Sequence, residues 1–600
     1  MGDESWAFGT LNAKRMTPTE VARAFVMPDI FQEISGLDHC YVVGPRGSGK
    51  TTLLRMLHGE SLAAWQGRVA EQQRSRITYS GIFLPADELW ASQTNPQTAR
   101  AAFALQMLLS FLDCVEYRTG RRSSSGTDVH LGVTLDGKGE TEFVRECAEG
   151  WGVSPSSNTV LGLQAALDLA LLRLGSSTRP NSGHLGAVGT LELLRFGVRA
   201  FNRAVGQSQH RWAVLLDELE LAPPEIHNEV QRFIRGGSGE LILKVSISPF
   251  DPYMHSFIAS GGAPSPANDF RAVYLSGQSR QDIRRFTEGL WKETLRQNGY
   301  TQVSMRRAFD NASADRASGD LETSFEQDQR EMLVRTRDAD PDFAAWLTAR
   351  AVDPDNLDRL TYNQRSATVR KVYPLLVFRD ALISFRKERP VRRSRKKSVE
   401  PFTGASAIAA ALEGNPRWIK SAFSDMVRSY DPATESVSIG FQLDALKGVA
   451  NRFDALLHVL PRTEGLAPTV SVPALVDTIA TYFNEQHLGP FNPEPPNSFK
   501  VDDNLSQPLI DALALALYAG AIVHLRGHRS SAVLSDFQGQ RFRLSYVLGV
   551  RDGKEFPLRL GRDVSLSRIV KHRDLRTGGR LPVESIPAKA RSPLQEEFSF

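Results

Sequence analysis

Short apolar runs alternate with helix-spaced apolar positions over the first half of the chain. A β-branched run at residues 38–43 precedes a glycine-rich turn, and leucines at helical spacing follow that turn. Further strands are predicted at residues 76–84, 212–216, 241–247 and 271–275, and helices at residues 98–117, 191–205 and 224–234. Because strands that alternate with helices form parallel sheets covered on both faces, we expect an α/β core over residues 16–276.

The second half of the chain has a different, mostly helical pattern. We predict a helical lid at residues 277–424, with a polar interruption at 311–328 and a basic run at 386–397 that we interpret as a solvated linker. Beyond it we predict two helices at residues 473–484 and 508–519, with a proline-rich loop at 490–496 between them. Two paired strands are predicted to follow, at residues 541–550 and 555–560. This order predicts a winged-helix-like domain at residues 425–600.

The first domain, residues 1–276, is expected to carry an insertion around residues 119–190. Its first part, residues 119–139, is rich in glycine, serine and threonine and is predicted to be a loop or hairpin. A chain of 600 residues with 41% apolar composition is long enough for these three domains.

Charge and cysteine content narrow the classes of function. A net charge of +4 is too small to indicate nucleic-acid binding, because that requires positive charge concentrated on one face. Cys40, Cys114 and Cys147 are widely spaced and lack a CxxC pair, which excludes a disulfide framework or zinc module of the usual spacing. We expect a cytoplasmic protein without membrane association, since the longest uncharged apolar stretch, residues 512–523, is shorter than a bilayer span.

The glycine-rich turn carries the clearest chemistry. Residues 44–51 match GxxxxGK[ST], between a predicted strand and a predicted helix. Glycines let backbone amides and the helix amino terminus face phosphate groups. Lys50 is expected to neutralise the β and γ phosphates, and the Thr51 hydroxyl to bind Mg²⁺. The predicted ATP-binding residues are Gly44, Pro45, Arg46, Gly47, Ser48, Gly49, Lys50, Thr51 and Thr52.

An acidic strand end supplies the partner motif. The apolar run at residues 212–216 is followed by Asp217 and Glu218. Asp217 is expected to hold Mg²⁺ through water, and Glu218 to orient or deprotonate the attacking water. Ser246 and Ser248 end the next predicted strand on one face, and either could contact that water or the γ phosphate.

The motif order resembles AAA+ ATPases of the origin-recognition and initiator type, which are close to the STAND signalling NTPases. In those families a GxxR or GNPR segment starts a lid helix, and Gly414-Asn415-Pro416-Arg417 matches it. The resemblance implies that Arg417 reaches the γ phosphate, and that residues 13–28 form the lead-in to the phosphate loop. It also implies a homo-oligomer with an arginine from a neighbouring subunit, for which Arg271 is the candidate between residues 249 and 275.

Two biological roles remain open at this stage. One is a DNA-associated switch, in which the carboxy-terminal domain grips duplex DNA. Its candidate phosphate contacts are Arg526, His528, Arg529, Arg541 and Arg543. The other is a STAND-like sensor or antiviral defence ATPase, whose carboxy-terminal domain recognises a protein or foreign ligand and controls an effector protein. An ABC-type ATPase is excluded because residues 205–211 lack an LSGGQ-like signature.

Overall fold

The first half of the molecule is built on a five-stranded parallel sheet. The computed structural model describes residues 15–91, 93, 95–121, 129–176, 183–237, 239–250, 264, 268–310, 321–359, 371–396, 399–460, 470–503, 505–526 and 533–571. The strands are β1 (Cys40–Val43), β2 (Ser80–Leu84), β3 (Trp212–Leu216), β4 (Leu241–Ile247) and β5 (Arg271–Tyr274). Their order is β2-β3-β4-β1-β5, and every neighbouring pair is parallel. The predicted α/β core is thereby confirmed.

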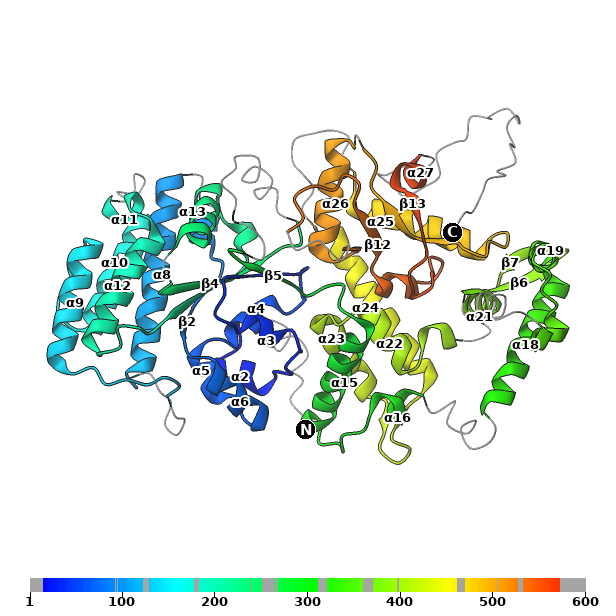
Figure 1. Cartoon of the computed structure of the whole chain (residues 1–600), viewed down its shortest axis with the longest axis horizontal. Coiled ribbons are helices and arrows are strands. Elements are labelled where there is room, and N and C mark those ends of the chain that lie inside the picture. The colour runs from blue at the N-terminus through cyan, green and yellow to red at the C-terminus, as the bar shows by residue number, and fades with distance from the viewer. Residues whose placement is uncertain are drawn as a thin grey trace.

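Strand alternation divides the apolar side chains between two cores, one on each face of the sheet. On β1, Tyr41 and Val43 face one core while Cys40 and Val42 face the other. Figure 1 shows the two layers of helices. The first core is covered by α8 (Pro96–Arg118), α9 (Gly137–Trp151), α10 (Val160–Ser176), α12 (Thr190–Ala204) and α13 (Pro224–Gly236). The second is covered by α2 (Pro18–Arg23), α3 (Phe31–Ile34), α4 (Lys50–Arg55), α5 (Gly59–Ala64) and α6 (Arg68–Arg76).

The region around residues 119–190 is mainly helical. Its helices α9, α10 and α11 (Gly183–Ala187) pack on α8 and α12, whereas residues 119–121 and 129–136 hold no strand in the described part. A second difference concerns β2, which begins at Ser80 because the charged residues before it extend α6 to Arg76. Among the described helices, α8 alone is long and apolar enough to cross a membrane, but it is mostly buried as a core helix.

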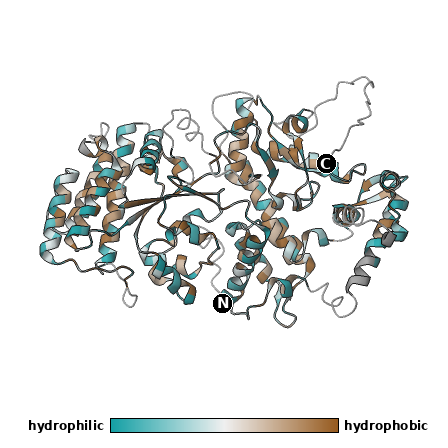
Figure 2. Ribbon diagram, viewed as in Figure 1, coloured by the Kyte–Doolittle hydropathy of each residue, from teal (hydrophilic) through white to brown (hydrophobic). Residues whose placement is uncertain are grey.

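The lid and the carboxy-terminal region share one continuous apolar core, from Leu290 to Ile569. Figure 2 shows apolar positions concentrated in the helices around this core. The helices around it are α15 (Arg280–Gln297), α16 (Met305–Phe309), α22 (Ala405–Leu412), α23 (Pro416–Val427), α24 (Ile439–His458), α25 (Val472–Leu488) and α26 (Gln507–Ala519). A side module consists of α18 (Leu321–Ala339), α19 (Pro341–Ala349) and α21 (Tyr373–Leu382). It has a small core of its own that includes Leu376 of α21, whereas Phe378, Ala381 and Leu382 of α21 pack into the larger core.

The carboxy-terminal region contains a four-stranded sheet in the order β11-β12-β10-β13. The strands are β10 (Pro496–Lys500), β11 (Ile522–His524), β12 (Arg541–Leu544) and β13 (Arg562–Ser565). The predicted pairing of residues 541–550 with 555–560 was wrong: β12 pairs with β10 and β11, and a buried 3₁₀ turn, η6 (Tyr546–Val550), follows it. An apolar run looks alike in a buried turn and a buried strand, so its hydropathy could not separate them. The winged-helix arrangement stays a prediction.

The basic run at residues 386–397 forms a hairpin in its described part, residues 386–396, and is not a linker, although most of its side chains are exposed. Strands β6 (Ile383–Arg386) and β7 (Arg389–Arg392) form an antiparallel hairpin. Arg392 donates to the fully buried carboxylate of Glu555 at 2.7 Å, and the Lys396 ammonium lies 3.2 Å from it. A buried carboxylate needs charged partners, and these two cations of the run supply them.

Candidate nucleotide-binding site

The loop between β1 and α4 is folded against the start of the lid. Gly47 and Gly49 have φ angles of +83° and +93°, a backbone region that glycine adopts without strain. A Cβ atom at Gly47 would lie 3.2 Å from the Arg417 side chain, and one at Gly49 would lie 3.2 Å from Pro416 Cγ. Both glycines are therefore needed for the turn and for the close approach of the lid.

A buried carboxylate joins this loop to the acidic strand. Asp217 is fully buried, and its two carboxylate oxygens accept from Thr51 Oγ1 at 2.7 Å and from Ser246 Oγ at 2.6 Å. Burial raises the pKa of Asp217, while the hydrogen bonds from Ser246 and Thr51 lower it. The structure thus brings together the two predicted Mg²⁺ ligands, which are 166 residues apart in sequence.

Glu218 follows Asp217 in a left-handed backbone conformation, with a φ of +53°. Its amide donates to Ser246 Oγ at 2.8 Å, so Ser246 connects both acidic residues. Ser248 is also buried. A non-glycine residue at positive φ is strained, and such strain is common at functional sites.

Lys50 has two partners within the protein. Its ammonium donates to the carbonyl oxygen of Gly44 at 2.6 Å and lies 3.7 Å from Glu220 Oε1. Burial raises the pKa of Glu220, and the charge of Lys50 opposes this shift. The sequence analysis missed Glu220, although an acid three positions beyond Asp217 was a visible signal.

Arg417 lies at the amino terminus of α23, next to the phosphate loop. The side chain of Asn415 caps this helix by accepting from the amides of Arg417 and Trp418, at 3.0 and 3.4 Å. Burial lowers the pKa of Arg417, and the neighbouring charge of Arg46 lowers it further. The GNPR segment therefore starts a helix whose first side chains reach the loop.

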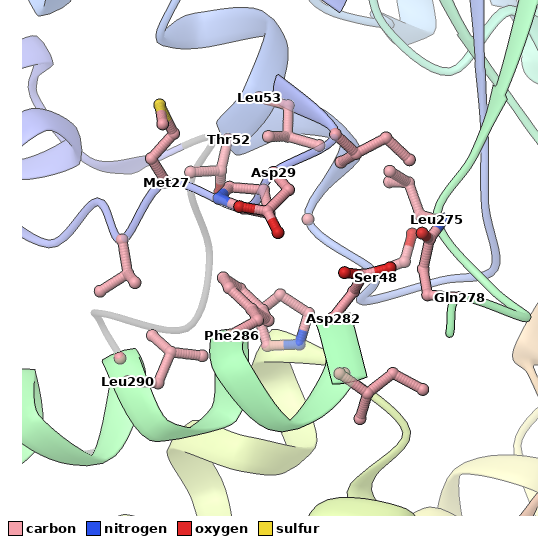
Figure 3. A pocket seen from close by; sticks show the side chains of 18 of the residues that line it. Met27, Asp29, Ser48, Thr52, Leu53, Leu275, Gln278, Asp282, Phe286 and Leu290 are labelled. Atoms are coloured by element: carbon pink, nitrogen blue, oxygen red, sulfur yellow. The ribbon is translucent and has the colours of Figure 1, made fainter. Parts of the chain in front are cut away.

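Two cavities lie on the two sides of the phosphate loop and share Ala24, Ser48, Gly49, Thr52, Pro416 and Lys420. The first, of about 390 Å³, is lined by Lys50, Thr51, Glu218, Arg417 and Tyr518, among others. The second, of about 350 Å³, is mostly apolar and lies between α15 and the lead-in to β1. Figure 3 shows Phe286 and Leu290 of α15 on one side of it, and Met27, Thr52 and Leu53 on the other. A polar cavity beside an apolar one suits a ligand with phosphates at one end and an apolar ring at the other.

Comparison with known proteins identifies the family of the chain. The sequence model of the ORC-CDC6-like family matches residues 7–566. The chain belongs to the ORC-CDC6-like family. The resemblance to origin-recognition AAA+ ATPases is thereby confirmed. No curated protein matches the chain. Among solved structures, it is similar to that of the Aeropyrum pernix ORC2 protein (ADPNP-ADP complexes), with 10% identity and a TM-score of 0.29 over 91% of this chain and 93% of that one.

One predicted site residue of this ORC-CDC6-like protein lies away from the others. Arg271 pairs in register with Cys40 at the start of β1, whereas the phosphate loop follows the end of β1. Its guanidinium forms an exposed ion pair with Asp38 at 2.7 Å. The structure therefore does not bring Arg271 to the nucleotide site of its own chain, and its role towards a neighbouring subunit stays a prediction.

The carboxy-terminal arginines of the protein are largely engaged within the chain. Arg526 lies 3.7 Å from the centre of the Tyr274 ring, and Arg543 is a buried ion-pair partner of Glu413. Arg541 is exposed and pairs with Asp563. His528 and Arg529 lie outside the described residues. Of the described candidates for phosphate contacts, Arg541 is therefore the exposed one, and duplex binding stays a prediction.

Proposed function

We propose that this ORC-CDC6-like protein binds ATP and hydrolyses it with Mg²⁺. The observation that carries the proposal is the contact of Thr51 and Ser246 with the buried carboxylate of Asp217. It joins the end of the phosphate loop to two neighbouring strand ends, which is the arrangement that phosphoryl transfer needs. A hydroxyl and a carboxylate are oxygen donors of the kind Mg²⁺ prefers, so these side chains fit the ion.

In the proposed mechanism, amides of residues 47–51 and the Lys50 ammonium bind the β and γ phosphates. Thr51, and Asp217 through water, would hold Mg²⁺, and the ion would neutralise charge on the phosphate oxygens. Glu218 accepts a proton from the attacking water, and Ser246 keeps the Glu218 backbone in place. Arg417 approaches the γ phosphate from the lid.

The apolar cavity is the proposed site for the adenine ring. It adjoins the phosphate loop, and its apolar walls come from Met27, Ile283 and Phe286, among others. An aromatic base gains favourable burial in such a cavity. Because the walls belong to both the α/β core and the lid, base binding would hold these two parts together.

At the biological level we propose a switch that oligomerises, with ATP controlling the lid. Association with duplex DNA is the candidate that family membership favours, since the family takes its description from origin-recognition proteins. The engagement of Arg526 and Arg543 within the chain favours the second candidate, a sensor that acts on an effector protein. Salt-dependent duplex binding by the purified protein separates the two.

The ATPase proposal is tested with two substitutions that have different expected outcomes. Lys50→Ala removes phosphate-binding charge and should weaken ATP binding strongly, whereas Glu218→Gln should preserve binding and block turnover. Titration with labelled ATP and a steady-state hydrolysis assay measure the two effects. Lys138→Ala and Glu142→Gln, an exposed pair on α9, are matched controls with the same charge changes. Wild-type hydrolysis in both site variants would contradict the proposal.

A further inference from the structure

The carboxy-terminal region contacts the phosphate loop directly. The backbone amide of Arg46 donates to the carbonyl oxygen of Tyr518, at the end of α26, with a distance of 2.8 Å. Gly520 follows with a φ of +86°, and a Cβ atom there would lie 3.1 Å from Pro45 Cβ. The end of α26 therefore lies in close contact with the first half of the loop.

Further contacts hold the carboxy-terminal region in this position. Arg526 stacks on Tyr274 at the end of β5 and donates to the carbonyl oxygen of Ser276 at 2.9 Å. Arg543 and Ser545 both contact the carboxylate of Glu413, immediately before the GNPR segment. The carboxy-terminal region thus contacts the sheet edge, the phosphate loop and the start of the lid helix.

The side chain of Tyr518 lies near the same site, since the charges of Glu220, Arg46, Glu218 and Arg417 all act on the pKa of its hydroxyl. It lines the polar cavity together with Glu218, which is proposed to act on the attacking water, and Arg417, which is proposed to approach the γ phosphate. It is half-buried; the ordinary pKa of 10.0 already leaves the phenol protonated at neutral pH, and burial raises that pKa further. A neutral phenol at this place is a hydrogen-bond donor that faces an anion-binding cavity.

We propose that Tyr518 is a nucleotide-binding residue supplied by the carboxy-terminal region: its hydroxyl donates to the terminal phosphate of a nucleoside triphosphate, and its carbonyl positions the loop. The inference rests on the proposed function, because it assumes that the loop binds ATP. It adds that triphosphate is distinguished from diphosphate by a residue outside the α/β core and the lid. Nucleotide state and the seating of the carboxy-terminal region are then coupled through a single residue.

The side-chain part is tested by equilibrium binding of a slowly hydrolysed ATP analogue and of ADP to the full chain. Tyr518→Phe keeps the ring but removes the donor, so the analogue should bind about 10-fold more weakly while ADP affinity changes less than about twofold. Tyr482→Phe, on α25, is the control, since Tyr482 is a half-buried tyrosine of the same region that lines neither cavity. An unchanged ratio of the two affinities in Tyr518→Phe overturns the inference while the ATPase proposal stands. Failure of the wild-type protein to bind either nucleotide overturns the ATPase proposal first.

The backbone part is tested by hydrogen exchange of the peptide that contains Arg46. Gly520→Ala places a Cβ atom against Pro45 at a positive φ and should separate α26 from the loop, which exposes the Arg46 amide to exchange. Gly440→Ala is the control, because a Cβ atom there meets nothing within 4 Å. In the wild-type protein, the ATP analogue should slow exchange at residues 518–521 more than ADP does. Equal protection by the two nucleotides contradicts the coupling even if Gly520→Ala does not fold.

Discussion

The Lys50 ammonium lies 3.7 Å from the Glu220 carboxylate, and both side chains are largely buried. Glu220 Oε2 is buried without a hydrogen-bond partner among the described residues. Under the proposed function, we expect the carboxylate to compete with nucleotide phosphates for the positive charge of Lys50.

Glu220→Gln is expected to tighten ATP binding, by about three- to tenfold, because it removes the competing charge and keeps the side-chain shape. Calorimetric titration with ATP measures the change. Glu142→Gln on the exposed surface of α9 is the matched control. Weaker binding by Glu220→Gln would show instead that the carboxylate supports the nucleotide-bound state.

A second prediction concerns Ser246, which lies in β4, and Ser248, which follows the end of that strand. Ser246→Ala leaves a buried oxygen of Asp217 and the Glu218 amide without their hydroxyl partner, and we expect kcat to fall about 10- to 100-fold. Ser248→Ala removes the hydroxyl of the serine two residues later, and we expect kcat to change by less than twofold. Steady-state hydrolysis at saturating ATP makes the comparison. Equal losses in both variants would remove the special role of Ser246.

The buried carboxyl group of Asp217 should make the free energy of unfolding fall as pH rises. Burial raises its pKa above the ordinary value of 3.8, so the folded protein keeps this proton at pH values where the unfolded chain has lost it. Its contribution to stability is present below that ordinary value and is lost as pH rises through the raised pKa. Asp217→Asn lacks this titration, so its free energy of unfolding relative to wild type should increase across that window. Urea unfolding at a series of pH values, in chelator-treated buffer, measures the difference; parallel curves would contradict it.

Much of the core of this site was predictable from local sequence. The loop at Gly44–Thr51 and the strand before Asp217 each carry a short pattern whose chemistry requires particular residues. The choice between Ser246 and Ser248 was not predictable, because strand alternation places both on one face. Only the three-dimensional distance to Asp217 distinguishes them.

Other residues of the site could not be predicted, because they are brought there by contacts between segments that are distant in sequence. Glu220 is buried beside Lys50, 170 positions away, and Tyr518 reaches the loop from the far end of the chain. No periodicity of hydrophobic residues encodes such pairings. The basic hairpin was misjudged for the same reason, since its buried partner Glu555 lies far along the sequence.

The contact between Arg417 and the loop predicts coupling between nucleotide and lid. Arg417→Ala should still bind ATP through Lys50 but should lose the protease protection that a slowly hydrolysed analogue gives the lid. Arg428→Ala, at the exposed end of the same helix, is the control. If protection persists in Arg417→Ala, the residue serves only the start of α23.

Arg541 and Arg543 lie two positions apart on β12, but we expect their substitution to affect the free energy of unfolding very differently. Arg543→Ala leaves the largely buried Glu413 carboxylate without its cation, so the free energy of unfolding should fall by about 3–5 kcal/mol. Arg541→Ala breaks an exposed pair with Asp563 and should cost less than about 1 kcal/mol. Urea unfolding of the two variants separates a structural arginine from a surface one.

The exposed position of Arg541 makes it the residue through which to test duplex binding. If it contacts one phosphate, the slope of log K against log salt should decrease in magnitude by about 0.9 in Arg541→Ala, with weaker binding at every salt concentration. Fluorescence anisotropy with a labelled duplex measures both quantities, and Arg306→Ala on α16, in the lid, controls for the loss of one exposed charge. Arg543→Ala is unsuitable here, because its loss of stability would mask any effect on binding. An unchanged slope and affinity in Arg541→Ala would remove this strand from the DNA contact, and the sensor candidate would then be the stronger one.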